Sequence, residues 1–208
     1  MNKVSLKEIF SLSEKLSRYC ENNKPVTYRP AIGQIRYAEK VLNFRLPPSY
    51  IQFWQEIKVC HWCLAGICKM VTADDNLSQH FPDIIAENMK IRKIVNNGTA
   101  IPPFLTVFDV AAAIDDDYCC FDTRYGSAEG EYPVVYWSTE EPDYLVSYDK
   151  TDGSELIIDD IIRAASDFPT YLYNCLEDEI KIREQQLKRK KQTKQNQIKH
   201  RHSRQNMR

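Results

Sequence analysis

The 208-residue sequence lacks the features that mark most membrane, secreted and cofactor-dependent proteins. It has no apolar run near the ~18 residues that a membrane-spanning helix needs. Lysines and glutamates interrupt the apolar positions of its first sixteen residues, which argues against a secretion signal. There is no phosphate-binding glycine loop, nucleophile elbow or dinucleotide-binding fingerprint. These absences predict a cytoplasmic protein that is not an enzyme and carries no cofactor.

Metal-ligating residues are few and poorly placed. The strongest pattern is the C-x2-C pair of Cys60 and Cys63 with Cys68 nearby, since such a pair is half of a zinc site. Its other half would have to come from Cys119 and Cys120, which are adjacent and would point to opposite faces of a strand. A redox role would need the pair at a helix N-terminus, but its aromatic surroundings favour a strand. We therefore interpret the cysteines as reduced, packed thiols, with metal binding and redox chemistry as the alternatives.

Charge is distributed very unevenly along the chain. Residues 181–208 hold eleven of the 28 Lys and Arg residues but only one of the 29 Asp and Glu residues. The remaining residues 1–180 therefore hold 17 basic and 28 acidic residues, a balance of −11. An acidic body favours a basic partner, and a basic tail more weakly favours an acidic one.

Hydrophobic periodicity predicts one domain with appendages, built from both helices and strands. Helices are expected over residues 5–20, 34–42, 48–58, 81–93, 155–167 and 169–188, and strands over residues 59–71, 104–110, 132–137 and 144–148. Ser5 and Glu8 form a capping box at the start of the first helix. Pro48 suits the first turn of the third, and Tyr50, Phe53 and Trp54 give that helix a core-facing stripe. From residue 187 onward, low hydrophobicity and high charge predict disorder.

An acidic cluster lies between the two central strands. It comprises Asp115, Asp116 and Asp117, followed by Asp122, Glu129 and Glu131. Its spacing is not that of a calcium-binding EF-hand loop, and no histidine or nucleophile accompanies it for acid–base catalysis. The alternatives are a solvated acidic loop, a surface that docks a basic protein, and a metal or catalytic site.

Five short motifs, in order, resemble the SUKH superfamily. They are residues 42–54 (LNFRLPPSYIQFW), 101–105 (IPPFL), 117–122 (DYCCFD), 129–137 (EGEYPVVYW) and 168–172 (FPTYL). The resemblance covers roughly residues 32–176. The Asn-Gly pair expected after the first motif is missing, and Asp116 replaces the glycine expected before the aromatic strand.

The resemblance implies an α+β fold, an antiparallel sheet flanked by helices. It divides the chain into an N-terminal helix and linker (1–31), a SUKH-like domain (32–180) and a disordered basic tail (181–208). It also implies a non-enzymatic binding role, since many bacterial members are immunity proteins that neutralise toxins and a related branch includes a fungal regulator of cell-wall assembly.

Two functional hypotheses follow. In the first, the chain is an immunity protein that binds a basic toxin domain, such as a nuclease. The expected contact residues are Asp115, Asp116, Asp117, Tyr118, Glu129, Glu131 and Trp137, with Tyr118 or Trp137 as an aromatic anchor. In the second, it is an intracellular regulatory scaffold whose basic tail contacts nucleic acid or an anionic membrane surface.

Overall fold

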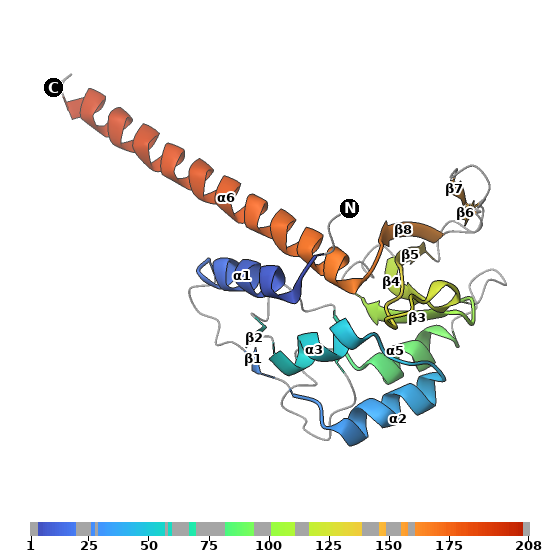
Figure 1. Cartoon of the computed structure of the whole chain (residues 1–208). Helices are drawn as coiled ribbons and strands as arrows, with labels where there is room; N and C mark the ends of the chain where they lie inside the picture. Colours follow the sequence, from blue (N-terminus) through green and yellow to red (C-terminus); the bar gives the residue numbers. More distant parts are fainter. Residues whose placement is uncertain are drawn as a thin grey trace.

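Four antiparallel strands form the sheet around which the described chain is arranged (Figure 1). The computed structural model describes residues 4–19, 26–27, 29–56, 58–59, 67–69, 82–93, 101–110, 117–138, 146–148, 155–157 and 161–205. The sheet has the order β3 (Leu105–Asp109), β4 (Asp117–Asp122), β5 (Val134–Ser138) and β8 (Ile161–Ala165). This confirms the predicted antiparallel sheet and the strands expected over residues 104–110 and 132–137, which correspond to β3 at one edge of the sheet and β5 inside it.

Besides this sheet, the described chain contains five helices and two short strand pairs (Figure 1). The helices are α1 (Leu6–Ser17), α2 (Ile32–Leu42), α3 (Pro48–Glu56), α5 (Ile84–Ile91) and α6 (Phe168–Gln205). The short pairs are β1 (Val26–Thr27) with β2 (Lys58–Val59), and β6 (Val146–Tyr148) with β7 (Glu155–Ile157). A 3-10 turn, η2 (Thr123–Tyr125), follows β4. The fold is therefore α+β, as expected.

Local sequence signals explain where α1 and α3 begin. The Ser5 hydroxyl accepts a hydrogen bond from the backbone N–H of Glu8, and the Glu8 carboxylate accepts one from the backbone N–H of Ser5 at 2.8 Å. This is the predicted capping box, which satisfies N–H groups that a helix leaves unpaired. Helix α3 begins at Pro48, where the missing N–H costs no intrahelical bond.

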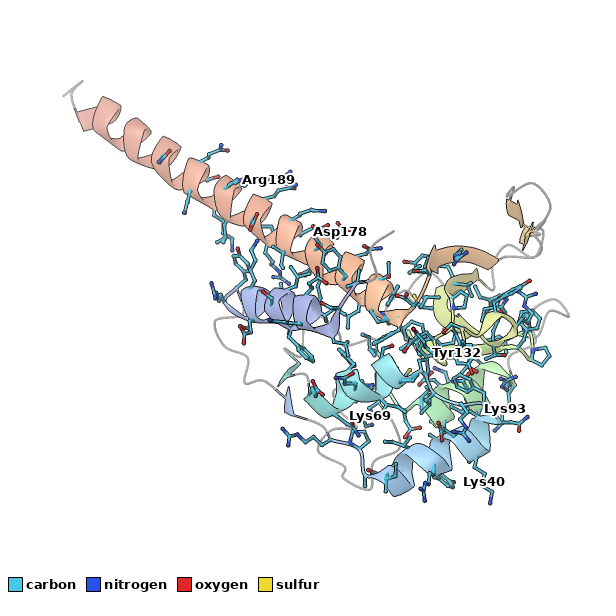
Figure 2. The ribbon with its side chains drawn as sticks, viewed as in Figure 1. Lys40, Lys69, Lys93, Tyr132, Asp178 and Arg189 are labelled. Atoms are coloured by element: carbon cyan, nitrogen blue, oxygen red, sulfur yellow. The ribbon has the colours of Figure 1, made fainter. Side chains whose placement is uncertain are left out.

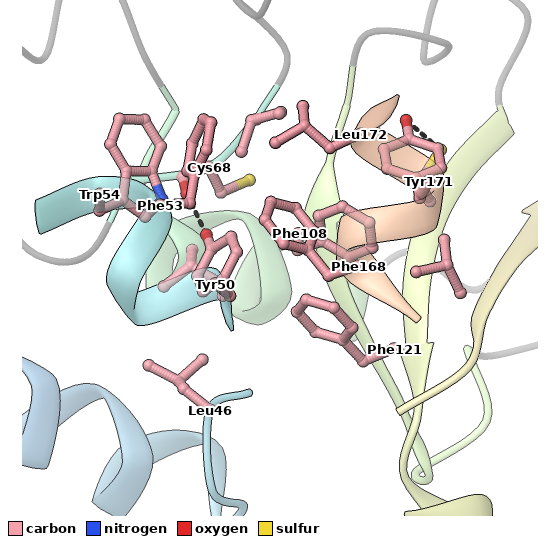
Figure 3. Close-up of a cluster of buried hydrophobic side chains, with 14 of the residues drawn as sticks. Leu46, Tyr50, Phe53, Trp54, Cys68, Phe108, Phe121, Phe168, Tyr171 and Leu172 are labelled. Carbon is pink, nitrogen blue, oxygen red and sulfur yellow. Dashed lines mark hydrogen bonds between the residues drawn. The ribbon is translucent and has the colours of Figure 1, made fainter. Parts of the chain in front are cut away.

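Five ring-bearing side chains form an aromatic core that joins α3, the sheet and α6 (Figure 3). We define this aromatic core as Tyr50, Phe53, Phe108, Phe121 and Phe168, all of which are fully buried. The rings of Phe108 and Phe121 stack with centroids 4.2 Å apart, and Phe168 meets both Tyr50 and Phe53 edge-on. Each such pair contributes about 0.5–1.5 kcal/mol beyond its burial.

A second core lies on the opposite face of the sheet, because strand side chains alternate between faces. In β4, the side chains of Cys119 and Phe121 pack on the face of the sheet that carries the aromatic core, whereas those of Tyr118 and Cys120 pack on the opposite face. The second core comprises Ile91, Ile101, Leu105, Val107, Tyr118, Cys120, Val135 and Trp137. Side chains on both faces of β4 are thus buried, and in β5 Val134 is buried on one face and Val135 and Trp137 on the other, whereas Tyr136 is 38% exposed.

The side chain of Asn88 on α5 closes the exposed edge of β3. Its amide nitrogen donates to the carbonyl of Val107 at 2.7 Å, and its amide oxygen accepts from the N–H of Val107 at 2.9 Å. These bonds replace those that a further strand would make, so the edge is not left available for pairing with another chain.

One secondary-structure prediction is wrong. Residues 155–167 were expected to be a helix, but they contain strands β7 and β8. Strand β8 pairs with β5, placing Ile161 opposite Trp137 and Ala165 opposite Val134. Pairing with a strand distant in sequence supplies contacts that local periodicity cannot reveal, and these contacts override helix propensity.

The C-terminal segment also differs from its prediction. Residues 181–208 were expected to be disordered, whereas α6 continues as helix to Gln205 and projects away from the sheet (Figure 1). Lys, Arg and Gln are good helix formers, and pairs such as Lys181 with Glu177 at 3.0 Å support the helix before its most basic part. The segment is nevertheless basic and exposed, as its composition predicted.

Candidate functional site

The connection between β4 and β5 is an ordered acidic loop. After η2, the backbone N–H of Ser127 donates to the carbonyl of Glu131 at 2.7 Å, and Gly130 N–H donates back to Ser127 at 3.0 Å. The Ser127 hydroxyl accepts further bonds from the N–H groups of Glu129 and Glu131. Gly130 has φ +83°, a left-handed conformation in which a side chain would be strained. These constraints fix the loop tip and leave Glu129 exposed on it.

Two hollows flank this loop, and Glu129 lines both of them. The hollow on one side has a volume of about 370 Å³ and is lined by Asp122, Tyr125, Ser127, Glu129, Glu131, Pro133, Val135, Arg163, Ser166 and Asp167. The other has a volume of about 620 Å³ and is lined by Glu39, Arg45, Leu46, Pro48, Ile51, Gln52, Gln55, Glu56, Ala128, Glu129 and Gly130. We call the loop and these two hollows the acidic groove. Its lining contains more carboxylates than guanidinium groups on both sides.

Glu131 ties the loop to the start of α3. Its carboxylate accepts a hydrogen bond from the backbone N–H of Ser49 at 2.9 Å and from the Ser49 hydroxyl at 2.6 Å. A carboxylate at a helix N-terminus satisfies an unpaired N–H and interacts favourably with the helix dipole. Glu131 therefore lines the groove but also holds its two walls together.

Asp122 has a similar structural task at the end of β4. It is 2% exposed, and its two oxygens accept a paired set of hydrogen bonds from Arg124 at 2.9 and 2.7 Å. The hydrogen bond to Asp122 raises the pKa of the Arg124 guanidinium, which also lies 3.8 Å over the ring of Phe104. Because the Arg124 guanidinium offsets the negative charge of Asp122, this carboxylate attracts a basic partner less strongly than an unpaired one would.

The two aromatic residues predicted to contact a partner lie inside the protein. Tyr118 and Trp137 are cross-strand neighbours with ring centroids 5.8 Å apart, and they are 7% and 2% exposed. Both belong to the second core. An anchor at an interface needs an accessible ring, so their placement favours a packing role over direct contact.

The predicted acidic contact residues fall into two sets. Glu129 and Glu131 come together in the acidic groove with Glu39, Glu56 and Asp167. The second set, Asp115 and Asp116, lies outside the described residues, and of Asp117 only the backbone is described, at the start of β4. Sequence reasoning missed Glu39, Glu56 and Asp167, because they come from α2, α3 and the β8–α6 junction and only the fold brings them to the loop.

Glu39 also helps to shape the groove. Its carboxylate accepts a hydrogen bond from the backbone N–H of Leu46 at 3.2 Å. This bond fixes the segment between α2 and α3, residues 43–47, which belongs to the first of the five SUKH-like motifs (residues 42–54). Other residues of the motif also have structural roles. Pro48 begins helix α3, the Ser49 hydroxyl donates a hydrogen bond to the Glu131 carboxylate, and the Tyr50 hydroxyl donates one to the carbonyl of Cys68 in the core.

The described cysteines are poorly suited to metal or redox chemistry. Burial raises the pKa of the Cys68 and Cys120 thiols well above the ordinary value, and that of Cys175 to about 11. Protonated thiols are weak nucleophiles and weak ligands. Within the described ranges, no group of three or more His, Cys, Asp or Glu side chains is placed to hold a metal ion. The Cys60 and Cys63 pair lies outside those ranges.

A buried polar group joins α6 to the sheet. The hydroxyl of Tyr171 donates to the carboxylate of Asp109 at 2.9 Å and lies 3.2 Å from the sulfur of Cys119. Burial raises the pKa of Tyr171 well above its usual value, which keeps the hydroxyl protonated as a donor. The group is enclosed, so it holds α6 in place and is not accessible to a partner.

Comparison with protein families identifies the family of the chain. A model of the family described as SUKH_5: SMI1-KNR4 cell-wall matches residues 9–150, which is more than half of the chain and contains the whole acidic loop. Among curated proteins, none matches the chain. No helix in the described part of the chain is both long enough and apolar enough to cross a membrane.

Proposed function

Because the chain belongs to the SUKH_5 family of SMI1-KNR4 type, we propose that it is a non-enzymatic binding protein whose acidic groove receives a basic protein partner. The family includes toxin immunity proteins. In its most specific form, the proposal is that the chain acts in the cytoplasm as an immunity protein and neutralises a toxin by covering its active surface.

The exposed position of Glu129 between two acidic hollows is the observation that carries this proposal. The loop tip is held by backbone and Ser127 hydrogen bonds, so little conformational freedom is lost when a partner binds. Carboxylates on both sides attract a basic surface and accelerate its association. Toxins that cleave nucleic acid need such basic surfaces to hold phosphates, which makes a nuclease the favoured toxin class.

Co-expression with the product of a neighbouring toxin gene tests the proposal. We expect the chain to protect cells and to co-purify with the toxin. Replacing Glu129 with lysine should weaken binding about tenfold and make it less sensitive to salt, because the substitution places a like charge against a basic partner. Glu14→Lys on α1 is the matched control, since it changes the net charge equally at an exposed position on another element.

Two results would contradict the proposal. The first is that no neighbouring gene product is neutralised or bound by the chain. The second is that Glu129→Lys and Glu14→Lys weaken toxin binding to the same extent, which would show that only net charge matters and not the groove.

A second candidate function rests on α6. Lys188, Arg189, Lys190 and Lys191 form an exposed basic run on the part of the helix that projects from the body (Figure 2). In this candidate the chain is a regulatory scaffold that contacts nucleic acid through phosphates. A membrane surface is less favoured, because an interfacial helix needs a continuous apolar face. A salt-dependent mobility shift of duplex DNA or RNA, lost on deletion of residues 187–208, would support it.

A further inference from the structure

Helices α2 and α5 share an exposed face with an apolar centre. Tyr37 and Val41 lie one turn apart on α2 and are 54% and 39% exposed, and Met89 on α5 is 52% exposed. With Ile32, these residues make up four of the eight large hydrophobic side chains that are exposed in the described part of the chain. Large apolar side chains gathered in one place, unlike single ones, usually mark an interaction surface.

A hollow joins the two helices on this face. It has a volume of about 360 Å³, and its lining includes Val41, Phe44, Met89, Arg92 and Pro103. Residues from α2, α5 and the approach to β3 therefore share one depression. Half of the lining is apolar, and the other half consists of Asn43, Asn88, Arg92, Thr106 and Thr123. The apolar half is where a partner's anchoring side chain is best desolvated, and the polar half supplies hydrogen-bonding groups.

Cations surround this apolar centre. Arg36 and Lys40 repeat one turn apart on α2 beside Tyr37 and Val41, and Lys93 follows α5 (Figure 2). All three side chains are exposed, and none forms an ion pair with any residue in the described ranges. We call these cations, with Tyr37, Val41 and Met89, the α2–α5 face.

The sign of this rim is opposite to that of the surrounding body. Residues 1–180 carry a balance of −11, yet the cations on this face have no acidic partners among the described residues. Like charges at a spacing of four on a helix destabilise it slightly. A partner's carboxylates would relieve that repulsion, while its apolar side chains would cover the centre.

We propose that the α2–α5 face binds an acidic amphipathic helical segment of a second protein. Two helices with a depression between them match the helix-in-groove mode, in which anchors at spacings of three and four enter an apolar groove. The segment's carboxylates lie against Arg36, Lys40 and Lys93. The proposal does not depend on the acidic groove, and it gives the molecule two binding surfaces of opposite charge.

A display selection tests the proposal on the full-length protein. A library of random sixteen-residue peptides is selected for binding to the protein, with counter-selection on the double variant Tyr37→Ser, Val41→Ser. We expect enriched peptides that carry Asp or Glu around apolar residues spaced three and four apart. Their affinity should fall at least about tenfold in the double variant, which removes apolar contacts at the centre of the interface. It should also fall at least about tenfold in Lys40→Glu, Lys93→Glu, which places like charges against the peptide's carboxylates.

Leu187→Ser is the matched control, because Leu187 is 43% exposed but lies on the projecting part of α6, away from both proposed binding surfaces. It should leave peptide affinity unchanged, and all variants should keep the melting temperature of the parent since the replaced side chains are exposed. Three results would overturn the proposal: that no peptides are enriched, that the enriched peptides are neutral or basic, or that they bind the double variant as tightly as the parent. Binding to phosphatidylserine vesicles in place of peptides, lost in the same variants, would also overturn it and identify a membrane surface.

Discussion

The two parts of α6 have the same backbone geometry but are held by different forces. In residues 168–180, the side chains of Phe168, Leu172, Leu176 and Ile180 are buried at intervals of four. Beyond Ile180, the described side chains are exposed or half-buried, and most are polar or charged. The first part is therefore fixed by packing against the body, and the second by its own backbone hydrogen bonds and helix propensity.

The boundary between the two parts is made by α1. The Glu184 carboxylate lies 2.9 Å from the Lys15 ammonium and accepts a hydrogen bond from the Tyr19 hydroxyl at 3.2 Å. C-terminal to Glu184, α6 makes no hydrogen bond or ion pair with any other element in the described part of the chain. Helix α6 therefore combines a packed core segment and an exposed, charged segment in one continuous helix.

The largest effect is expected from Phe168→Ala. Phe168 is fully buried and meets several rings of the aromatic core, so its removal should lower the free energy of unfolding by about 3–5 kcal/mol. Urea denaturation measures the change. Leu187→Ala, on the exposed part of the same helix, is the control and should change stability by less than about 0.5 kcal/mol. Similar losses in both variants would show that the two parts of α6 do not differ.

A smaller loss is expected from Tyr171→Phe. The substitution keeps the ring but removes the hydroxyl that donates to the buried carboxylate of Asp109, which should cost about 1–3 kcal/mol. Tyr173→Phe, at a half-buried position two residues away, should have little effect. Equal stability of the Tyr171 variant and the parent would mean that the hydroxyl does not help to hold α6 on the sheet.

A still smaller, pH-dependent effect is expected from Glu184→Gln. The hydrogen bond and charge of Lys15 lower the pKa of Glu184 below 4.5, so the ion pair stabilises the fold above that pH and is lost as the pH falls through the lowered value. Both groups are exposed, so added salt should weaken the effect. Melting temperatures measured from pH 7 downwards test this: the variant should differ from the parent at pH 7, and the difference should shrink as the pH falls below 4.5. A difference that does not change with pH would refute the ion-pair explanation.

The smallest effect on stability is expected from deletion of residues 187–208. The deletion keeps Glu184 and its contacts with α1 but removes nine of the basic residues. Because the exposed part of α6 buries almost nothing, the change in unfolding free energy should stay below about 0.5 kcal/mol. Circular dichroism should show a loss of helical signal without a shift of the melting temperature. A large drop in melting temperature would mean that the arm packs on the body.

Local signals in the sequence predicted the elements that local interactions specify. The capping box of Ser5 and Glu8 gave the start of α1, and the spacing of Tyr50, Phe53 and Trp54 identified both α3 and part of the core. Strand β8 was not predictable in this way, because residues 161–165 become a strand through pairing with β5. The helical extension of α6 was also not predicted. Its low hydrophobicity and high charge indicated disorder, although its Lys, Arg and Gln residues have high helix propensity.

The candidate site was predicted only in part, for a similar reason. The acidic loop was visible in the sequence, and the structure leaves Glu129 exposed on it, where its role as a contact residue stays a prediction. The burial of Tyr118 and Trp137 was not visible, because alternation along β4 and β5 places both side chains in a second core on the other face of the sheet. The contributions of Glu39, Glu56 and Asp167 depend on tertiary contacts.

The bond between Glu131 and Ser49 has a consequence for how binding specificity can change. The residues that anchor the β4–β5 loop, Ser127 and Glu131, differ from those that it displays at its tip, Ala128 and Glu129. Substitution at the tip therefore alters what the loop presents without loosening its attachment to α3. If the acidic groove binds a partner as proposed, substitutions at these two positions would change the surface that the partner meets, while the bond between Glu131 and Ser49 keeps the loop attached to α3.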